Sequence, residues 1–177
     1  MILLDACVLL NLCATDRLEE IGQCFPGGFS VAAAAREEAL FLRDPADAAQ
    51  PLKPLELDPF FQRGILHELP LAAAEESLFV NIAAELDEGE AMSMAIAIHR
   101  NLDLATDDRK ALRLFANFGG DPKRLWSTPS IMKTWADSAS PDGTELGRAV
   151  RAIRDRARYV PAANHPLYPW WSQLMAQ

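Results

Sequence analysis

Acidic residues stand at the ends of short apolar segments in this chain, where folding could bring their side chains together. Asp5 directly follows the apolar residues 2–4, and Asp107 and Asp108 end a second apolar run. Glu90 opens a mostly apolar stretch a short distance before that second run. In open parallel α/β sheets, sites form at the carboxyl ends of the strands. We therefore expect these four acids to meet at one edge of a sheet.

A further acid could reach the same edge from the helix that we expect after a second strand. Glu37 or Glu38 lies one to two turns into that helix. Gathering several carboxylates is costly, because two unit charges about 4 Å apart repel by about 4 kcal/mol at an effective dielectric of about 20. Oxygen ligands without His or Cys suit hard cations, which activate water and clamp phosphate groups. The acids therefore predict a site for Mg²⁺ or Mn²⁺.

Each acid also has an ordinary structural role open to it. Asp5 could cap the helix expected over residues 6–14, and the acid pair 107–108 could cap the helix that follows it. Glu90 forms the pattern of a capping box with Asp87. The two glutamates of the earlier helix could simply be solvated. The order and context of the acids, and no single one of them, favour the metal site.

Short apolar segments alternate with helical patterns along the chain, which predicts an α/β fold with a parallel sheet. Strands are expected over residues 2–4, 29–31, 102–106 and 125–127. Helices are expected over residues 6–14, 32–43, 72–85, 87–100, 110–118 and 145–159. Residues 44–70 contain five prolines and are expected to form a loop with short helical or extended pieces.

Length and composition indicate about one globular domain. The chain has 177 residues, is 50% hydrophobic and carries a net charge of −8, so a nucleic-acid site must be local or neutralised by metal. Its three cysteines form no CxxC pair, which argues against a disulfide framework or structural zinc and favours a reducing, cytoplasmic setting. Asp5 interrupts the N-terminal apolar run, so neither a signal peptide nor a membrane span is expected.

Four segments of the chain resemble the acidic motifs of PIN-domain nucleases. They are residues 5–12 (DACVLLNL), 35–40 (AREEAL), 87–91 (DEGEA) and 104–109 (LATDDR). The resemblance covers residues 1–130 and implies a PIN-like three-layer α/β/α sandwich around a parallel sheet. Residues 131–177 are then a C-terminal extension, consisting of a helix and a Pro/Trp-rich tail packed on the nuclease domain.

The resemblance implies a metal-dependent endoribonuclease, and it assigns roles to the acids. Asp5, Glu90 and Asp108 would bind Mg²⁺ or Mn²⁺, with Asp107 assisting or replacing Asp108. Glu38 would orient the attacking water or a second ion, and Glu37 remains an alternative to it. The catalytic set is therefore Asp5, Glu38, Glu90 and Asp108.

One departure from the family pattern leaves a second function open. Cys7 stands where the family usually has Ser or Thr, and a thiol is a weaker hydrogen-bond partner than a hydroxyl. The alternative is a non-catalytic PIN-like module that binds nucleic acid or protein. Similar small bacterial proteins act as toxins held by a cognate antitoxin. The expected partners are RNA, an antitoxin and a second copy of the chain, with no membrane.

Basic residues that could contact the RNA backbone occur in two places. Arg109 and Lys110 follow the acid pair 107–108. Arg148 and Arg151 belong to the basic segment 143–159, in which we also expect Arg158 near the same face. In each place, a helix surface paired to acidic neighbours is the alternative. The Trp-rich tail could stack bases or pack on its own domain.

Overall fold

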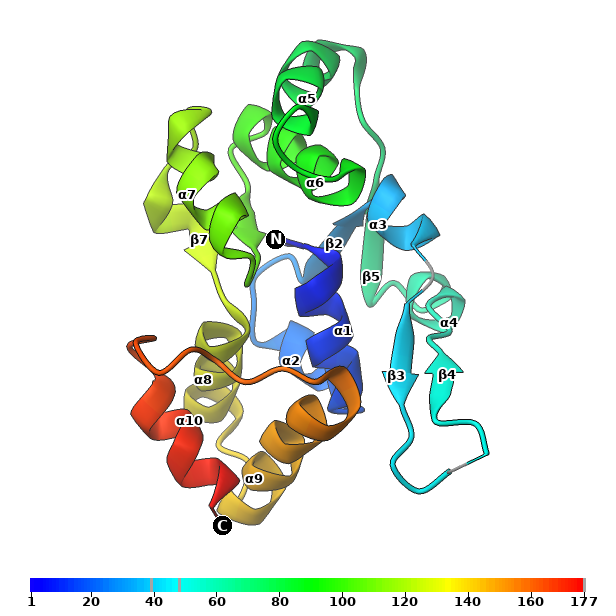
Figure 1. Ribbon diagram of the computed structural model, residues 1–177, viewed down its shortest axis with the longest axis vertical. Helices are drawn as coiled ribbons and strands as arrows, with labels where there is room; N and C mark the ends of the chain where they lie inside the picture. The colour runs from blue at the N-terminus through cyan, green and yellow to red at the C-terminus, as the bar shows by residue number, and fades with distance from the viewer. Residues whose placement is uncertain (39, 48, 177) are drawn as a thin grey trace.

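A five-stranded sheet, parallel throughout, forms the centre of the computed structural model, which describes residues 1–38, 40–47 and 49–176 (Figure 1). The strand order is β5-β2-β1-β6-β7. The strands are β1 (Ile2–Leu4), β2 (Phe29–Ala32), β5 (Leu66–Leu69), β6 (Asp103–Ala105) and β7 (Leu125–Trp126). The chain therefore has the expected α/β class and a parallel sheet.

Helices cover both faces of the sheet. One face carries α1 (Ala6–Ala14), α2 (Leu18–Gln23), α8 (Thr128–Ala139), α9 (Gly143–Ala152) and α10 (Tyr168–Met175). The other carries α5 (Glu76–Ala83), α6 (Glu88–His99) and α7 (Arg109–Asn117). The shorter helical pieces are α3 (Ala33–Glu37), α4 (Asp58–Gln62), η1 (Ala73–Glu75), η2 (Pro122–Arg124) and the π-helical turn η3 (Ile153–Ala157). None of the helices within the described ranges combines the length and apolarity needed to cross a bilayer.

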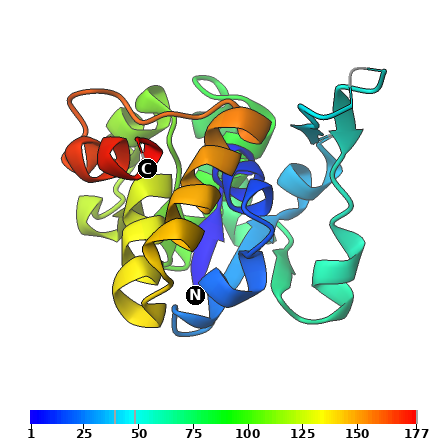
Figure 2. The same cartoon turned by 90° about the horizontal axis from the view of Figure 1, so that it is seen from below.

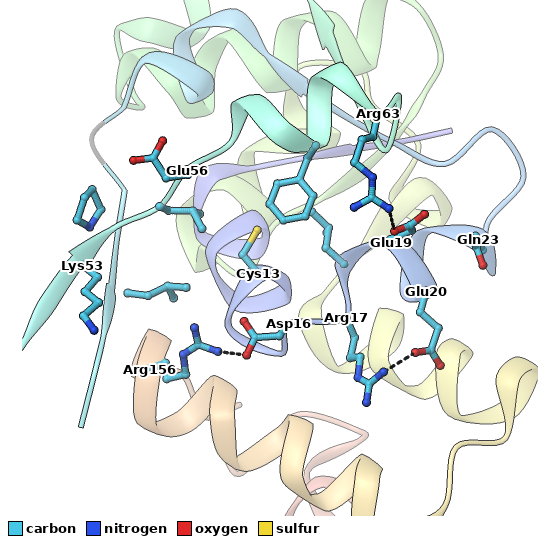
Figure 3. A pocket seen from close by; sticks show the side chains of 15 residues that line it. Cys13, Asp16, Arg17, Glu19, Glu20, Gln23, Lys53, Glu56, Arg63 and Arg156 are labelled. Carbon is cyan, nitrogen blue, oxygen red and sulfur yellow. Dashed lines mark hydrogen bonds and ion pairs between the residues drawn. The ribbon is translucent and has the colours of Figure 1, made fainter. Parts of the chain in front are cut away.

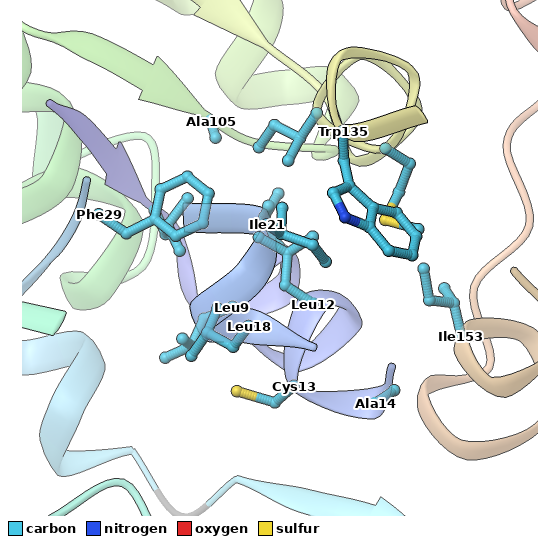
Figure 4. Packing of buried hydrophobic residues seen from close by; sticks show 14 of the residues in the cluster. Leu9, Leu12, Cys13, Ala14, Leu18, Ile21, Phe29, Ala105, Trp135 and Ile153 are labelled. Atoms are coloured by element: carbon cyan, nitrogen blue, oxygen red, sulfur yellow. The ribbon is translucent and has the colours of Figure 1, made fainter. Parts of the chain in front are cut away.

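The central strands are buried on both sides, as parallel strands under helices must be. In β1, Ile2 and Leu4 join one hydrophobic core and Leu3 joins the other, because successive side chains point to opposite faces. Figure 4 shows side chains of the first core, where Trp135 of α8 lies near Ile21 of α2. The C-terminal helices contribute to this same core, where α8 contacts α1 and α2.

The prediction of a helix over residues 32–43 was wrong beyond Glu37. Residues 41–43 form β3 (Phe41–Arg43), which pairs antiparallel with β4 (Leu52–Pro54). Leu42 is buried while Phe41 and Arg43 are exposed, the period-two pattern of a strand on a half-covered surface. Figure 2 shows this hairpin projecting at one side of the molecule.

Several other elements were predicted only in part or not at all, and α2 and α10 are among those not predicted. The strand β5 is one of the short extended pieces expected within residues 44–70, but its bounds were not predicted, because His67, Glu68 and the following Pro70 obscure the strand pattern. The helix α8 was not predicted, although Ser127 and Pro129 are start signals for a helix. The helix expected over residues 145–159 is α-helical to Ala152 and continues as the π-helical turn η3 to Ala157, after which Arg158 adopts a left-handed conformation with φ of 62°. Arg158 is therefore not on the helical face predicted for it.

Candidate functional site

Asp5 lies at the carboxyl end of β1, where the chain turns into α1. Its side chain is only 4% exposed and is held by three hydrogen bonds. The Ala6 N–H donates to Oδ1 at 2.7 Å, and Thr106 Oγ1 donates to Oδ2 at 2.9 Å. Burial raises the pKa of Asp5, the hydrogen bonds oppose that rise, and the charge of Asp87 adds to it. Asp5 is thus both a helix cap and a buried acid with a raised pKa.

Cys7 supplies the third hydrogen bond to Asp5. Its Sγ donates to Asp5 Oδ2 at 3.1 Å. Cys7 is exposed as a residue, but its Sγ is partly desolvated beside the Asp5 carboxylate; both effects raise the pKa of the thiol, so it stays protonated and remains a donor. The hydrogen bond that a Ser or Thr hydroxyl would give at this position is therefore present, in weaker form.

Glu90 faces the other acids from the first turn of α6. Burial, together with the charges of Asp87, Asp5 and Asp108, raises its pKa to about 7. Asp87 caps the helix by accepting the Glu90 N–H at 2.9 Å. No hydrogen bond to the Glu90 carboxylate occurs among the described residues, so the reciprocal half of the predicted capping box is missing there. The carboxylate is free to interact at the site.

Glu38 approaches the same helix end from the residue after α3. Its pKa is raised by burial and then by the charges of Asp87 and Asp5. A Cβ atom on Gly89 would overlap Glu38 Oε1, so the glycine is what lets this carboxylate lie over the first turn of α6. The side chain of Glu37 lies outside what the structure describes. Glu38 is therefore the glutamate that the geometry brings to the acids.

Ser93 adds a polar atom that sequence reasoning missed. It lies three residues after Glu90 and lines a narrow crevice together with Asp5, Glu90 and Thr106. Ser93 is 1% exposed, and its Oγ has no hydrogen-bond partner among the described residues. A buried hydroxyl without a partner is costly, and the crevice leaves no room for a water molecule beside it. The available signal was a single hydroxyl in an otherwise apolar helical stretch.

The acid pair after β6 divides between two environments. Asp108 caps α7, with its Oδ1 accepting the N–H groups of Lys110 and Ala111, each at 2.7 Å. Its charge acts on Glu90, as described above. Asp107 points instead toward the helices on the other face of the sheet.

Asp107 forms the centre of a buried hydrogen-bond network. Its carboxylate accepts the N–H and the hydroxyl of Thr128, at 3.0 and 2.5 Å. Asn11 Nδ2 and the Tyr159 hydroxyl donate to it at 3.1 and 2.9 Å. Burial raises the pKa of Asp107 and these hydrogen bonds lower it. Asp107 therefore connects the end of β6 to α1, α8 and the C-terminal segment, and the sequence offered no sign of these partners.

The acids approach one another without enclosing an ion. Within residues 1–38, 40–47 and 49–176, no three His, Cys, Asp or Glu side chains stand in an arrangement that could hold a metal ion. Ionised carboxylates repel each other, so a bound cation would have to draw them together. The charges of Asp87, Asp5 and Asp108 already act together on the pKa of Glu90.

The four basic side chains predicted to contact RNA differ in whether they already bond to other residues. Lys110 donates to the Glu85 carbonyl, and Arg151 Nη1 donates to the Leu174 carbonyl at 3.3 Å. Arg109 and Arg148 are exposed, and neither forms an ion pair within the described ranges. Two of the four are thus available to a ligand.

A charged pocket lies between α2, the β3–β4 hairpin and η3, away from the acids (Figure 3). Its volume is about 620 Å³. Each of its basic side chains forms an ion pair with a neighbouring acid; the bases are Arg17, Lys53, Arg63 and Arg156. The pocket therefore has no unbalanced charge to attract an anion.

Comparisons of the chain with protein-family models, with curated proteins and with solved structures gave no match. The residues of the chain itself therefore carry the functional argument.

Proposed function

We propose that the chain is a metal-dependent endoribonuclease of the PIN type. One observation carries the proposal: acids from separate segments gather at the carboxyl edge of the sheet, where burial and, to a smaller extent, their charges raise the pKa of Glu90 to about 7. Perturbed carboxylates in such a place are typical of functional sites. The order of the acids in the chain matches the family's four motifs, as set out above.

The donor set at this edge fits a hard cation. Asp5, Glu90 and Asp108 would hold Mg²⁺ or Mn²⁺, and the unpartnered Ser93 hydroxyl offers a further oxygen within the crevice. Such an ion, when bound, activates water and neutralises charge on a phosphate. It would also relieve the repulsion among the carboxylates.

The surrounding residues would position the reacting groups. Thr106 and Cys7 hold the Oδ2 atom of Asp5, which fixes the orientation of that carboxylate. Glu38 would orient the attacking water. Its raised pKa makes its carboxylate a better proton acceptor near neutral pH than an ordinary glutamate.

Cleavage of single-stranded RNA by the purified protein, with Mn²⁺ or Mg²⁺ present, tests this proposal. We expect cleavage by the wild type and a loss of at least about a hundredfold for Asp5→Asn, since an essential ligand is removed. Asp137→Asn is the matched control, because Asp137 makes only a surface ion pair with Lys133 on α8. Equal cleavage by wild type and Asp5→Asn would show that a contaminant is responsible.

The family resemblance extends the proposal to the role of a toxin held by an antitoxin. Induced expression in a bacterial host should then arrest growth, and Asp5→Asn should relieve the arrest. A non-catalytic binding module is the alternative that Cys7 suggested. The thiol's hydrogen bond to Asp5 weakens the case for it, because the support that a hydroxyl would give is retained.

A further inference from the structure

A second pocket opens between α7 and the C-terminal segment, beside the acidic edge. Its volume is about 880 Å³. Arg109 and Arg113 of α7 line one side, Trp126 of β7 lines another, and the segment from Tyr159 to Leu167 completes the wall. Figure 1 shows that this segment crosses the molecule before α10 begins. The C-terminal extension thus supplies a large part of the pocket.

Two unpaired guanidinium groups distinguish this pocket from the charged pocket near α2. Arg109 and Arg113 are four residues apart and therefore share a face of α7. Both are exposed, and neither has a carboxylate within ion-pair distance among the described residues. In a chain with a net charge of −8, two adjacent free arginines mark a local site for an anion.

The rest of the lining suits a flat, partly polar ring. Leu112, Trp126 and Pro166 contribute apolar surface, and Asn164 contributes an amide that can both donate and accept hydrogen bonds. Proteins hold unpaired bases with this combination of apolar or aromatic walls and polar groups. A phosphate at the arginines and a base against the wall would together fill such a pocket.

The pocket contains a Ser–His pair, but its geometry does not suit catalysis. Ser127 Oγ lies 3.1 Å from His165 Nε2. The Leu167 N–H donates to His165 Nδ1 at 3.1 Å, so the proton of the neutral ring is on Nε2. The histidine therefore donates to Ser127 and cannot accept the serine proton. The pair joins the C-terminal segment to the start of α8, and the pocket is built for binding.

Asp107 connects this pocket to the acidic edge. Its carboxylate lines the pocket, while the residues on either side of it, Thr106 and Asp108, belong to the acid site. Its oxygens already accept four hydrogen bonds, so Asp107 is part of the pocket's fixed wall. A strand of RNA lying over the acids would reach the pocket with a neighbouring nucleotide.

We propose that this pocket binds one nucleotide of a single-stranded RNA, next to the phosphate that the acids address. The phosphate of that nucleotide contacts Arg109 and Arg113, and its base packs against Trp126. This inference rests on the proposed ribonuclease function for the identity of the ligand. It gives the C-terminal extension a role in substrate binding.

The test measures binding of a fluorescein-labelled single-stranded RNA of about five nucleotides, by anisotropy in EDTA. We expect Arg113→Glu to weaken binding at least about tenfold relative to wild type. Arg43→Glu is the matched control, because Arg43 is exposed, unpaired among the described residues and placed on the β3–β4 hairpin. Its effect should stay within about twofold. The variant Asn164→Ala should weaken binding without any change of charge.

Separate outcomes identify which proposal fails. Equal binding by wild type and Arg113→Glu overturns the pocket, and so does equal weakening by Arg43→Glu. Absence of RNA binding by a folded wild-type protein also overturns it and favours a protein partner. RNA cleavage is measured on the same preparations with Mn²⁺. If Arg113→Glu specifically weakens RNA binding but the wild type does not cleave RNA, the pocket proposal is supported and the nuclease proposal is refuted.

Discussion

Individual residues at the acidic edge combine local structural roles with chemistry. Asp5 and Asp108 both cap helices, yet both also contribute charge to the cluster. The capping explanation of each acid is therefore correct without excluding the functional one. Glu90 differs, since Asp87 caps α6 and leaves the Glu90 carboxylate to the site. Clustering of this kind stabilises protonated carboxyl groups and costs folding free energy once they ionise.

The raised pKa of Glu90 predicts how stability depends on pH in EDTA. Its pKa is about 7 in the folded protein and 4.5 in the unfolded chain, so the folded state binds more protons between these values. The free energy of unfolding should therefore fall as pH rises from about 5 to about 7 and then level off. Glu90→Gln should reduce this slope and raise stability at about pH 8 by about 1 kcal/mol, allowing for solvent screening.

Urea denaturation at several pH values measures this effect. Glu76→Gln is the control, because Glu76 is an exposed residue on α5. An unchanged slope in Glu90→Gln would mean that Glu90 titrates as an ordinary surface glutamate.

At the scale of the elements, helices and strands with a clear hydrophobic period or cap could be predicted from the sequence. Elements that form only through contacts with distant segments could not. β1, α1 and α6 have long apolar runs or clear caps, and the structure places them where the sequence indicated. β5 forms by pairing with the edge of β2, which is distant in the sequence. A local sequence pattern does not reveal such a long-range pairing. The approach of Glu38 to Gly89 likewise depends on how α3 and α6 pack. The order of the acids was visible in the sequence, whereas Ser93 and the partners of Asp107 required the fold.

The Asp107 network predicts that Tyr159 fastens the C-terminal segment to the sheet edge. Tyr159→Phe removes the donor 2.9 Å from Asp107 and leaves a buried carboxylate with one hydrogen bond fewer. We expect a loss of about 1–3 kcal/mol in the free energy of unfolding. Tyr168→Phe is the matched control, because the Tyr168 hydroxyl makes no hydrogen bond within the described part of the chain. A similar loss of unfolding free energy in both variants would mean that the Tyr159 hydroxyl does not stabilise the fold through Asp107.

For the whole molecule, metal binding should couple to stability, since a cation that binds only the folded acid cluster shifts the unfolding equilibrium. Mn²⁺ at about a hundredfold over its dissociation constant should add about 2.7 kcal/mol, or about 5–10 °C in Tm. The gain should grow from about pH 6 to about pH 8, because the ligands must lose their protons to bind. Asp5→Asn should lose most of it, and Asp137→Asn should keep it. Differential scanning fluorimetry measures each shift, and an equal response from Asp5→Asn would place the bound ion elsewhere on this acidic protein.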